Sequence, residues 1–158
     1  MILRRGTVPA TVVGASYPAP HVLPAGRLSF AHLTEAGGLG QFGVALETLH
    51  PGGQSSQPHW HEAEDEFLYL LDGELTVIED GVENVLHPGD ACCWPAGSPV
   101  AHALMNRSGA DATYLIAGTR APVDVVHYPG RDLMHVRDDD FRDRYTHLDG
   151  TPFEEEAK

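Results

Sequence analysis

Two histidines at positions i and i+2, His59 and His61, are followed by a carboxylate, Glu66, at the head of an apolar run. In an extended strand residues i and i+2 point to the same face, so both imidazoles can converge on one ion while Trp60 points away. Imidazole and carboxylate ligands suit a divalent first-row metal with open coordination positions. The same residues also fit a solvated, charged hairpin, because such pairs are common by accident. The spacing therefore predicts a metal site that needs independent support.

Support for Glu66 comes from the turn that follows it. Asp72-Gly73 is typical of a two-residue hairpin turn, and pairing across that turn places Glu66 opposite Glu79. Four apolar side chains then share the face of Glu66: Leu68, Leu70, Leu75 and Val77. A carboxylate that points into an apolar interior is costly unless it is paired or bound to a metal. The register therefore predicts that Glu66 is a ligand, with Phe67 and Tyr69 on the outer face.

The spacing resembles the first signature of the cupin superfamily, G-x5-H-x-H-x4-E-x6-G. Its fixed positions are filled by Gly53, His59, His61, Glu66 and Gly73. The resemblance implies a conical β-barrel and a metal held by these two histidines and Glu66.

The second cupin signature, G-x5-P-x-G-x2-H-x3-N, is matched less closely. Gly89, Pro95 and Gly97 are in register, and His102 stands before Asn106 at the expected interval. Four residues, 98–101, separate Gly97 from His102 where the signature has two. We expect the extra residues to lengthen a turn, and the resemblance implies that His102 is the fourth metal ligand.

The rest of the chain looks like one subgroup of small single-domain microbial cupins, some of which carry the label of sugar-phosphate isomerase. The segments that carry this resemblance are Gly40-Gln41-Phe42-Gly43, His59-Trp60-His61-Glu62, Gly118-Thr119-Arg120, Val126-His127-Tyr128-Pro129 and Asp149-Gly150-Thr151-Pro152. The subgroup implies a fold and a metal site, and it leaves the reaction open.

Three imidazoles and one carboxylate leave positions open for water, oxygen or a substrate on one divalent ion, which is Fe, Mn, Ni or Zn. Asn106, Gln54 and Gln57 are candidates to orient the ligands, and Tyr69 is a candidate to line a pocket. No residue is assigned a catalytic role. The seven other histidines show no mutual ligand spacing, and Cys92 and Cys93 fit small buried hydrophobic residues.

Turn signals such as Pro51-Gly52-Gly53 and Asp80-Gly81 recur about every eight residues from Gln41 to Gly118, which is typical of an all-β sandwich or barrel. We expect a double-stranded β-helix, the cupin jelly roll. The chain divides into an N-terminal arm (1–38), the barrel core (39–120) and a C-terminal strand with a charged tail (121–158). Strands are expected at 7–13, 44–49, 112–117 and 123–127, and no helix of ordinary length is expected.

The chain has 158 residues and a formal net charge of -13, so nucleic acids and anionic membranes are not expected partners. No stretch approaches the roughly 18 apolar residues of a membrane span. The two adjacent cysteines offer no disulfide framework, which favours a cytoplasmic protein. The resemblance implies a homodimer and a small-molecule ligand or substrate.

Two classes of function remain open. The first is a metal-dependent enzyme that acts on a small organic molecule, either as an oxygen-dependent dioxygenase or as an isomerase or lyase. A sugar phosphate would need a cationic clamp; the only lysine is Lys158, so Arg107 or Arg120 would have to serve. The second class is a module that binds or senses a small molecule without turnover. A storage role is disfavoured because the ligand set is intact.

Overall fold

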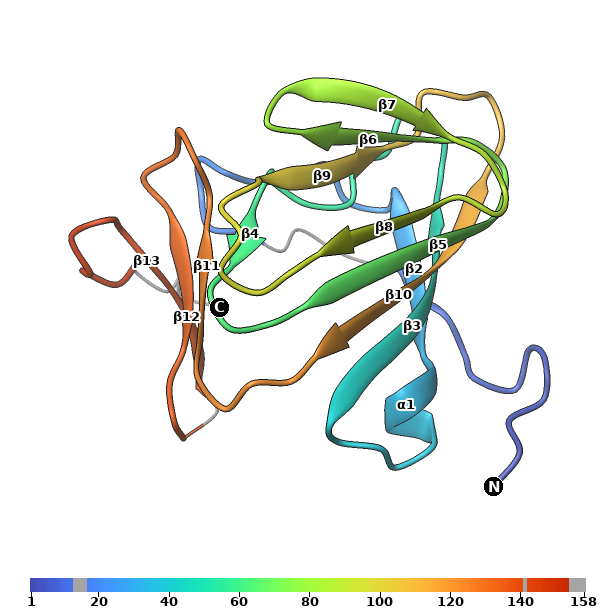
Figure 1. Ribbon diagram of the computed structural model, residues 1–158, viewed down its shortest axis with the longest axis horizontal. Helices are drawn as coiled ribbons and strands as arrows, with labels where there is room; N and C mark the ends of the chain where they lie inside the picture. The colour runs from blue at the N-terminus through green and yellow to red at the C-terminus, as the bar shows by residue number, and fades with distance from the viewer. Residues whose placement is uncertain (13–16, 141, 154–158) are drawn as a thin grey trace.

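The computed structural model describes residues 1–12, 17–140 and 142–153. The chain forms three antiparallel sheets and one short helix, α1 (Leu33–Ala36) (Figure 1). The large sheet has the order β1 (Thr11–Val12), β2 (Leu28–His32), β3 (Phe42–Leu49), β10 (Ala112–Thr119), β5 (Glu66–Asp72) and β8 (Ala91–Trp94). The small sheet has the order β7 (Val82–Leu86), β6 (Leu75–Glu79) and β9 (His102–Met105).

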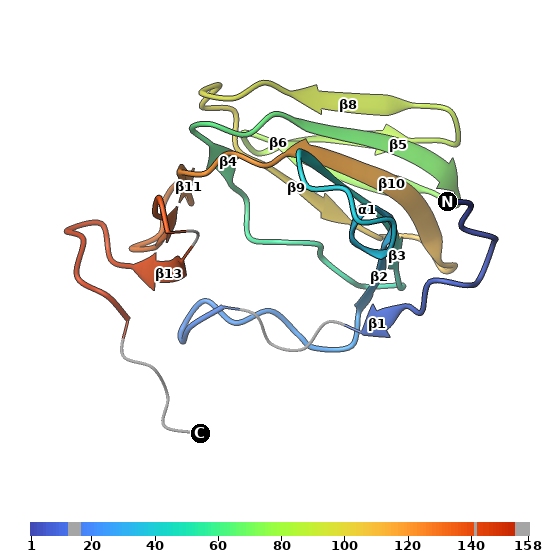
Figure 2. The same cartoon turned by 90° about the horizontal axis from the view of Figure 1, so that it is seen from below.

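A third sheet lies at one end of the other two (Figures 1 and 2). Its order is β13 (Asp143–Thr146), β12 (Met134–Arg137), β11 (Asp124–His127) and β4 (Trp60–His61). The strand β4 brings the H-x-H segment into this sheet, so the segment joins the barrel to the C-terminal strands. The predicted all-β jelly-roll architecture is confirmed, and α1 is only four residues long.

The core lies between the inner faces of the large and small sheets. Its fully buried members are Leu49, Leu68, Leu70, Leu75, Ala112 and Tyr114. They come from β3, β5, β6 and β10, and each is an alternate residue of its strand, so one face of each strand is withdrawn from water. Burying a Leu side chain contributes about 1.5–3 kcal/mol, which makes this cluster the main source of stability.

The strands expected at 44–49 and 112–117 are present and slightly longer. The strand expected at 123–127 begins at Asp124. Of the strand expected at 7–13, only Thr11–Val12 forms, and Val13 lies outside the described residues. The strand β2 was not predicted, because proline and glycine precede it in the sequence. It lies within the predicted N-terminal arm (1–38) and pairs with β3. The boundaries of the arm, core and tail stay predictions.

The expected hairpin at Asp72-Gly73 is wrong. The strand β5 pairs with β10 and β8, whereas β6 pairs with β7 and β9, so the chain crosses from the large sheet to the small sheet at Gly73. The two-residue hairpin turn is instead at Asp80-Gly81, where both residues have positive φ (47° and 82°) and Glu79 pairs with Val82. Local sequence does not distinguish the two Asp-Gly pairs.

Packing at Gly73 explains the crossing. Gly73 has φ 85°, and a Cβ there would lie 2.5 Å from the Asp111 carbonyl oxygen and 2.7 Å from the Ala112 Cα. The chain can therefore turn into the small sheet only where no side chain intervenes. The predicted pairing of the two strands was wrong, but the predicted buried face was right. The core contains Leu68, Leu70, Leu75 and Val77, because side chains alternate along each strand whichever strand it pairs with.

In the charged C-terminal run Asp139 and Asp140 are exposed, whereas Arg137 and Asp138 are half-buried and pair with Asp143 and Arg144. The acidic segment 154–156 lies outside the described residues. Among the residues described, no helix is long and apolar enough to cross a membrane. The cytoplasmic location stays a prediction.

Candidate metal centre

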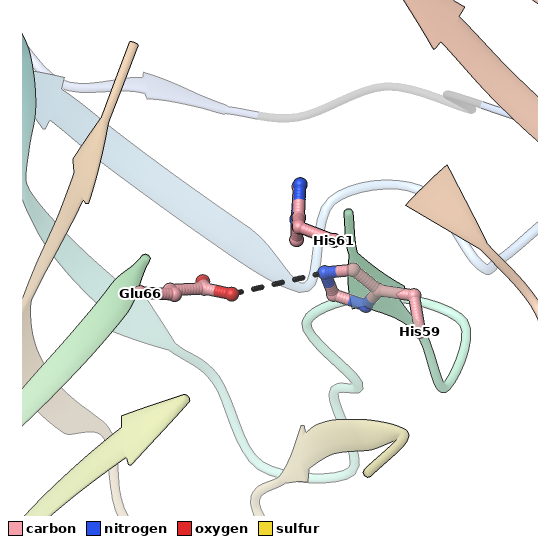
Figure 3. A group of neighbouring side chains, drawn as sticks. All are labelled: His59, His61 and Glu66. Carbon is pink, nitrogen blue, oxygen red and sulfur yellow. Dashed lines mark ion pairs between the residues drawn. The ribbon is translucent and has the colours of Figure 1, made fainter. Parts of the chain in front are cut away.

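The H-x-H segment passes between two sheets. His59 forms an isolated bridge with His102 at the start of β9, and two residues later His61 pairs with Val126 of β11. Trp60 turns away and stacks on His127, with ring centroids 4.3 Å apart. The rings of His59 and His61 lie 5.2 Å apart on the same side (Figure 3). The predicted convergence of these two imidazoles is therefore present in the structure.

Glu66 and His102 approach the same point from opposite sheets. Glu66 is the first residue of β5, and its Oε2 lies 2.8 Å from Nε2 of His102. The same oxygen lies 3.9 Å from Nε2 of His59 (Figure 3). His102 is buried at the start of β9, so the extra residues 98–101 lie in the connection before it and do not displace it. Its ring stacks on Trp94 at 3.8 Å, which fixes the plane of the imidazole.

Two hydrogen bonds orient the other imidazoles. Nδ1 of His61 donates to Oδ2 of Asp124 at 2.7 Å, and Nδ1 of His59 donates to the Gln57 carbonyl oxygen at 2.9 Å. In each ring Nε2 is therefore the nitrogen that is free to bind a metal. Metal-binding histidines commonly donate their other ring N–H to a carboxylate or carbonyl oxygen in this way, which fixes the tautomer and the orientation of the ring.

Asp124 was missed by the sequence analysis. It is almost fully buried, and it also accepts a hydrogen bond from the backbone N–H of Ala63 at 2.9 Å. A signal was present, because Asp124 is the single carboxylate in the apolar run Val123–Val126. A carboxylate in such a strand needs a partner, which is the argument already applied to Glu66.

The surroundings of the cluster favour an ionised Glu66 beside a neutral His59. Burial lowers the pKa of His59 to about 4, so this ring stays neutral and able to bind a metal over the physiological range. Burial would raise the pKa of Glu66, but the hydrogen bond from His102 and the nearby His59 lower it below its ordinary value. For His61, burial lowers the pKa, and the hydrogen bond to Asp124 with the charge of Glu66 outweighs burial and raises it.

The donor set and its spacing fit one divalent ion. Ligand atoms of His59, His61 and Glu66 all lie within 4.8 Å of one another, and His102 lies at 2.8 Å from Glu66. Neighbouring ligands at about 2.1 Å from one ion would be roughly 3 Å apart, so small side-chain movements suffice. Nδ1 of His102 is buried and has no hydrogen-bond partner among the described residues. The imidazole and carboxylate donors match a first-row transition metal.

The predicted supporting residues lie in different places. Gln57 is buried; its carbonyl holds His59, while its side chain donates to the His21 carbonyl oxygen at 2.7 Å and ties the N-terminal segment to the centre. Gln54 donates to the Ser56 carbonyl oxygen, and the Ser56 hydroxyl lies 3.2 Å from Nδ1 of His59, so the contact of Gln54 with the centre is indirect.

Asn106 and Tyr69 are not brought to the centre. Asn106 follows the far end of β9, where its side-chain amide donates to the carbonyl oxygens of Leu49 and Ala110. Tyr69 is 39% exposed on the outer face of β5, because it is three residues from Glu66 and alternation turns it outward.

A cavity of about 600 Å³ opens beside the centre, and His61 and Glu66 form part of its wall. Six carboxylates line it: Glu35, Glu47, Glu64, Asp65, Glu66 and Asp143. The lining also contains Arg120 and Arg137, of which only Arg120 was considered from the sequence. Arg107, the other candidate clamp, pairs with Glu83 on the surface. The volume suits a small organic molecule.

Comparison with known proteins gives the family. The model of the cupin domain matches residues 45–118. A crystal structure of a sugar phosphate isomerase from a cupin superfamily, from Silicibacter pomeroyi, is 35% identical with a TM-score of 0.87, and the match covers 98% of this chain and 97% of that chain. The chain belongs to the cupin superfamily.

Two further relatives differ in how much they share with this cupin. A candidate sugar phosphate isomerase from Acidithiobacillus ferrooxidans is 26% identical, with a TM-score of 0.73 over 86% of this chain and 83% of that chain. Quercetin 2,3-dioxygenase from Bacillus subtilis is 37% identical over 59 residues, which is 37% of this chain. The match spans only 17% of the dioxygenase, so it bears on the cupin segment alone.

Proposed function

We propose that this cupin is a metal-dependent isomerase that acts on a small hydroxycarbonyl compound of the sugar class. The observation that carries the proposal is the convergence of three imidazoles and Glu66 beside a cavity large enough for a sugar, with His61 and Glu66 in its wall. The relative that matches nearly the whole chain and is named a sugar phosphate isomerase supports the same reaction class.

The residues His59, His61, Glu66 and His102 would hold the ion. A divalent ion with open positions polarises a carbonyl and stabilises negative charge on its oxygen. Asp124 and the Gln57 carbonyl keep two of the imidazoles in one tautomer and orientation. Trp94 holds the ring of His102, and its own Nε1–H donates to Glu79 at 2.7 Å. These contacts hold the four side chains in place before a substrate enters.

The charge of the cavity favours a neutral sugar over its phosphate ester. Arg120 is paired with Glu35 at 2.8 Å, and Arg137 is paired with Glu64 at 2.5 Å and with Asp143 at 3.0 Å. Both guanidinium groups are therefore already engaged, and six carboxylates outnumber them. A phosphate would have to displace a carboxylate from an arginine, whereas hydroxyl groups can donate to the carboxylates as they stand.

The experiment begins with elemental analysis of the purified protein, followed by loading with each of Fe, Mn, Ni and Zn. Each loaded form is incubated with D-glucose, D-ribose and D-glyceraldehyde and with their terminal phosphate esters. Proton NMR in D2O reports both the isomer formed and the carbon-bound proton exchanged. We expect turnover of a free sugar, with slower or no turnover of its ester. Absence of turnover with every probe and every metal would contradict the proposal.

The dioxygenase alternative rests on the match to quercetin 2,3-dioxygenase over 59 residues. It is tested with an oxygen electrode and quercetin in the presence of each metal-loaded form. Oxygen consumption without sugar isomerisation would favour the alternative. Saturable binding of a sugar in a calorimeter without either reaction would favour a module that only binds or senses its ligand.

A further inference from the structure

Glu47 is a carboxylate of the cavity that the metal centre does not use. It lies in β3, where Ala45 and Leu49 on the same face are buried, so alternation turns the side chain of Glu47 inward. The residue keeps part of its surface exposed, and it lines the same cavity as Glu66. It is thus deep within the protein and still within reach of a small molecule bound there.

The hydrogen bonding of Glu47 leaves its carboxyl group partly free. The hydroxyl of Tyr114, directly opposite on β10, donates to Oε2 of Glu47 at 2.7 Å. Tyr114 is fully buried, so the position of this donor is fixed by the core. Within the described part of the chain, no arginine, lysine or histidine forms an ion pair with Glu47. The carboxyl is therefore oriented but not neutralised.

The arrangement of small residues explains why the cavity connects Glu47 with the metal centre. On the inner face of the large sheet Gly118 pairs with Glu66 of β5 on one side and with Gly43 of β3 on the other. The next residue inward on β3 is Ala45, between Gly43 and Glu47. Between the rows of Gly118 and Tyr114, β10 carries Ile116 on the same face, opposite Ala45. The two glycines and Ala45 leave room above this part of the sheet, and Ile116, Glu47 and Glu66 line the resulting cavity.

The surroundings of Glu47 give it the acidity of a proton-transfer group. Burial raises its pKa to about 7, the negative charge of Glu66 adds to the effect, and the hydrogen bond from Tyr114 opposes it. The ionisable groups that act on it are Tyr114 from β10 and Glu66 from β5. The same cavity is also lined by the cationic or titratable side chains of His32, His61, Arg120 and Arg137 and by the carboxylates of Glu35, Glu64, Asp65 and Asp143. A general base or acid works best when its pKa is near the working pH, because both protonation states are then available.

We propose that Glu47 is the general acid–base of this cupin and moves a proton between two carbon atoms of the hydroxycarbonyl substrate. The role rests on the proposed isomerase function. The carboxylate of Glu47 takes the proton from the carbon beside the carbonyl, the electron pair of that C–H bond forms a carbon–carbon double bond, and the carbonyl π pair moves onto its oxygen to give an enediolate. The Glu47 carboxyl then returns the proton to the former carbonyl carbon, while the hydroxyl proton passes between the two substrate oxygens. No oxidant or reductant is consumed.

The main test compares wild type with Glu47→Gln, loaded with the same metal. Glutamine is nearly isosteric and can still accept the hydrogen bond of Tyr114, but it cannot take up a proton. We expect kcat for the sugar that the wild type isomerises to fall by about 10²- to 10⁴-fold, with KM and metal stoichiometry little changed. Glu83→Gln, on the exposed strand β7, is the matched control and should leave kcat unchanged.

A second measurement does not depend on turnover. The infrared C=O band of a protonated carboxyl should titrate near pH 7 in wild type and be missing from Glu47→Gln. Tyr114→Phe removes the bond that lowers the pKa of Glu47, so the band and the acid limb of the kcat profile should both move to higher pH. This variant also keeps the test available if Glu47→Gln folds poorly.

The outcomes separate the two proposals. Turnover by Glu47→Gln equal to that of wild type would overturn the role of Glu47 and leave the isomerase function standing. An active wild type whose pH profile is unmoved in Tyr114→Phe, with no carboxyl band near pH 7, would also overturn it. Turnover of no sugar by any metal-loaded wild type would overturn the isomerase function, and the proton-transfer role with it.

Discussion

The two ends of the barrel use the same strands for different purposes. At one end β5 begins with Glu66 and β9 begins with His102, and the two side chains meet at 2.8 Å beside the cavity. At the other end β5 carries Leu70, which is fully buried in the core, and β9 leads into Asn106. Each strand thus passes from a polar, accessible end to a sealed end within a few residues.

Polar groups occur at both ends, and the difference lies in how they are satisfied. Both polar atoms of the Asn106 side-chain amide are hydrogen-bonded. The nitrogen donates to the carbonyl oxygens of Leu49 and Ala110, and the oxygen accepts from the backbone N–H and the hydroxyl of Ser108. At the open end the Nε2 atoms of His59 and His61 form no hydrogen bond with any described residue, because their bonds to Gln57 and Asp124 use Nδ1. A closed network stabilises the fold, whereas an incomplete one indicates a site for a ligand.

The largest effect is expected from removing two ligands at the open end. The double variant His59→Ala, His61→Ala should lose tight metal binding while keeping its fold, because both side chains lie outside the main apolar cluster. Metal content by plasma mass spectrometry and a circular dichroism spectrum measure the two properties. His87→Ala, His147→Ala removes two histidines elsewhere and is the control. Full metal retention in the first variant would contradict the site assignment.

The closed end should respond in the opposite way. Leu70→Ala should lower the free energy of unfolding by about 2–5 kcal/mol, because it leaves a cavity in the core, and the folded variant should bind metal normally. Leu71→Ala, the next residue on the same strand but exposed, should change stability by no more than about 0.5 kcal/mol. Urea unfolding gives both values. Equal decreases in the free energy of unfolding of the two variants would contradict the view that the buried core at the closed end stabilises the fold.

Glu47 lies between the two ends and gives a pH-dependent effect on stability. Its pKa is about 7 in the folded protein against 4.5 ordinarily, so the folded state holds this proton more tightly than the unfolded state. The wild type therefore loses stability as the pH rises through about 7, by up to about 3 kcal/mol. Glu47→Gln should be the more stable protein at pH 8 and should match wild type near pH 4.5. Parallel melting-temperature curves against pH would contradict this expectation.

Asp124 should have a smaller effect than the ligands it supports. Asp124→Asn keeps an acceptor for Nδ1 of His61 but removes the negative charge, and we expect metal affinity to fall by about 10- to 100-fold. Competition against a chelator measures the change. Asp132→Asn, in the exposed pair with His147, is the matched control and should leave affinity unaltered. An unchanged affinity in Asp124→Asn would mean that the backbone alone positions His61.

The outer face of the large sheet should affect neither end. The homodimer implied by the family resemblance stays a proposal, and Phe67, Tyr69 and Leu71 offer it an exposed apolar strip on β5. We expect Phe67→Glu to shift the protein from dimer to monomer in light scattering, with metal content unchanged. A wild type that is monomeric at all concentrations would contradict the dimer, and a dimeric Phe67→Glu would exclude this strip as its interface.

Much of the barrel and the centre follows from the sequence, because alternation along a strand decides which side chains point inward. The two-residue spacing of His59 and His61 predicted that their side chains share a face. The apolar residues alternating with the outer face predicted that Glu66 points inward, even though the pairing at Asp72-Gly73 was wrong. The same rule applied to Asp124 and Glu47 would have predicted two more inward carboxylates. It also turns Tyr69 outward, which the structure shows.

Only the tertiary structure decided which inward groups meet. The sequence determined that this chain forms short strands with polar groups on inner faces, since that depends on neighbours along the chain. It did not determine that Gly73 is a crossing and Asp80-Gly81 a hairpin, because the distinction depends on packing against Asp111 and Ala112. The bond of Asp124 to His61 and the shared cavity of Glu47 and Glu66 likewise join residues far apart in sequence, and long-range pairing alone brings them together.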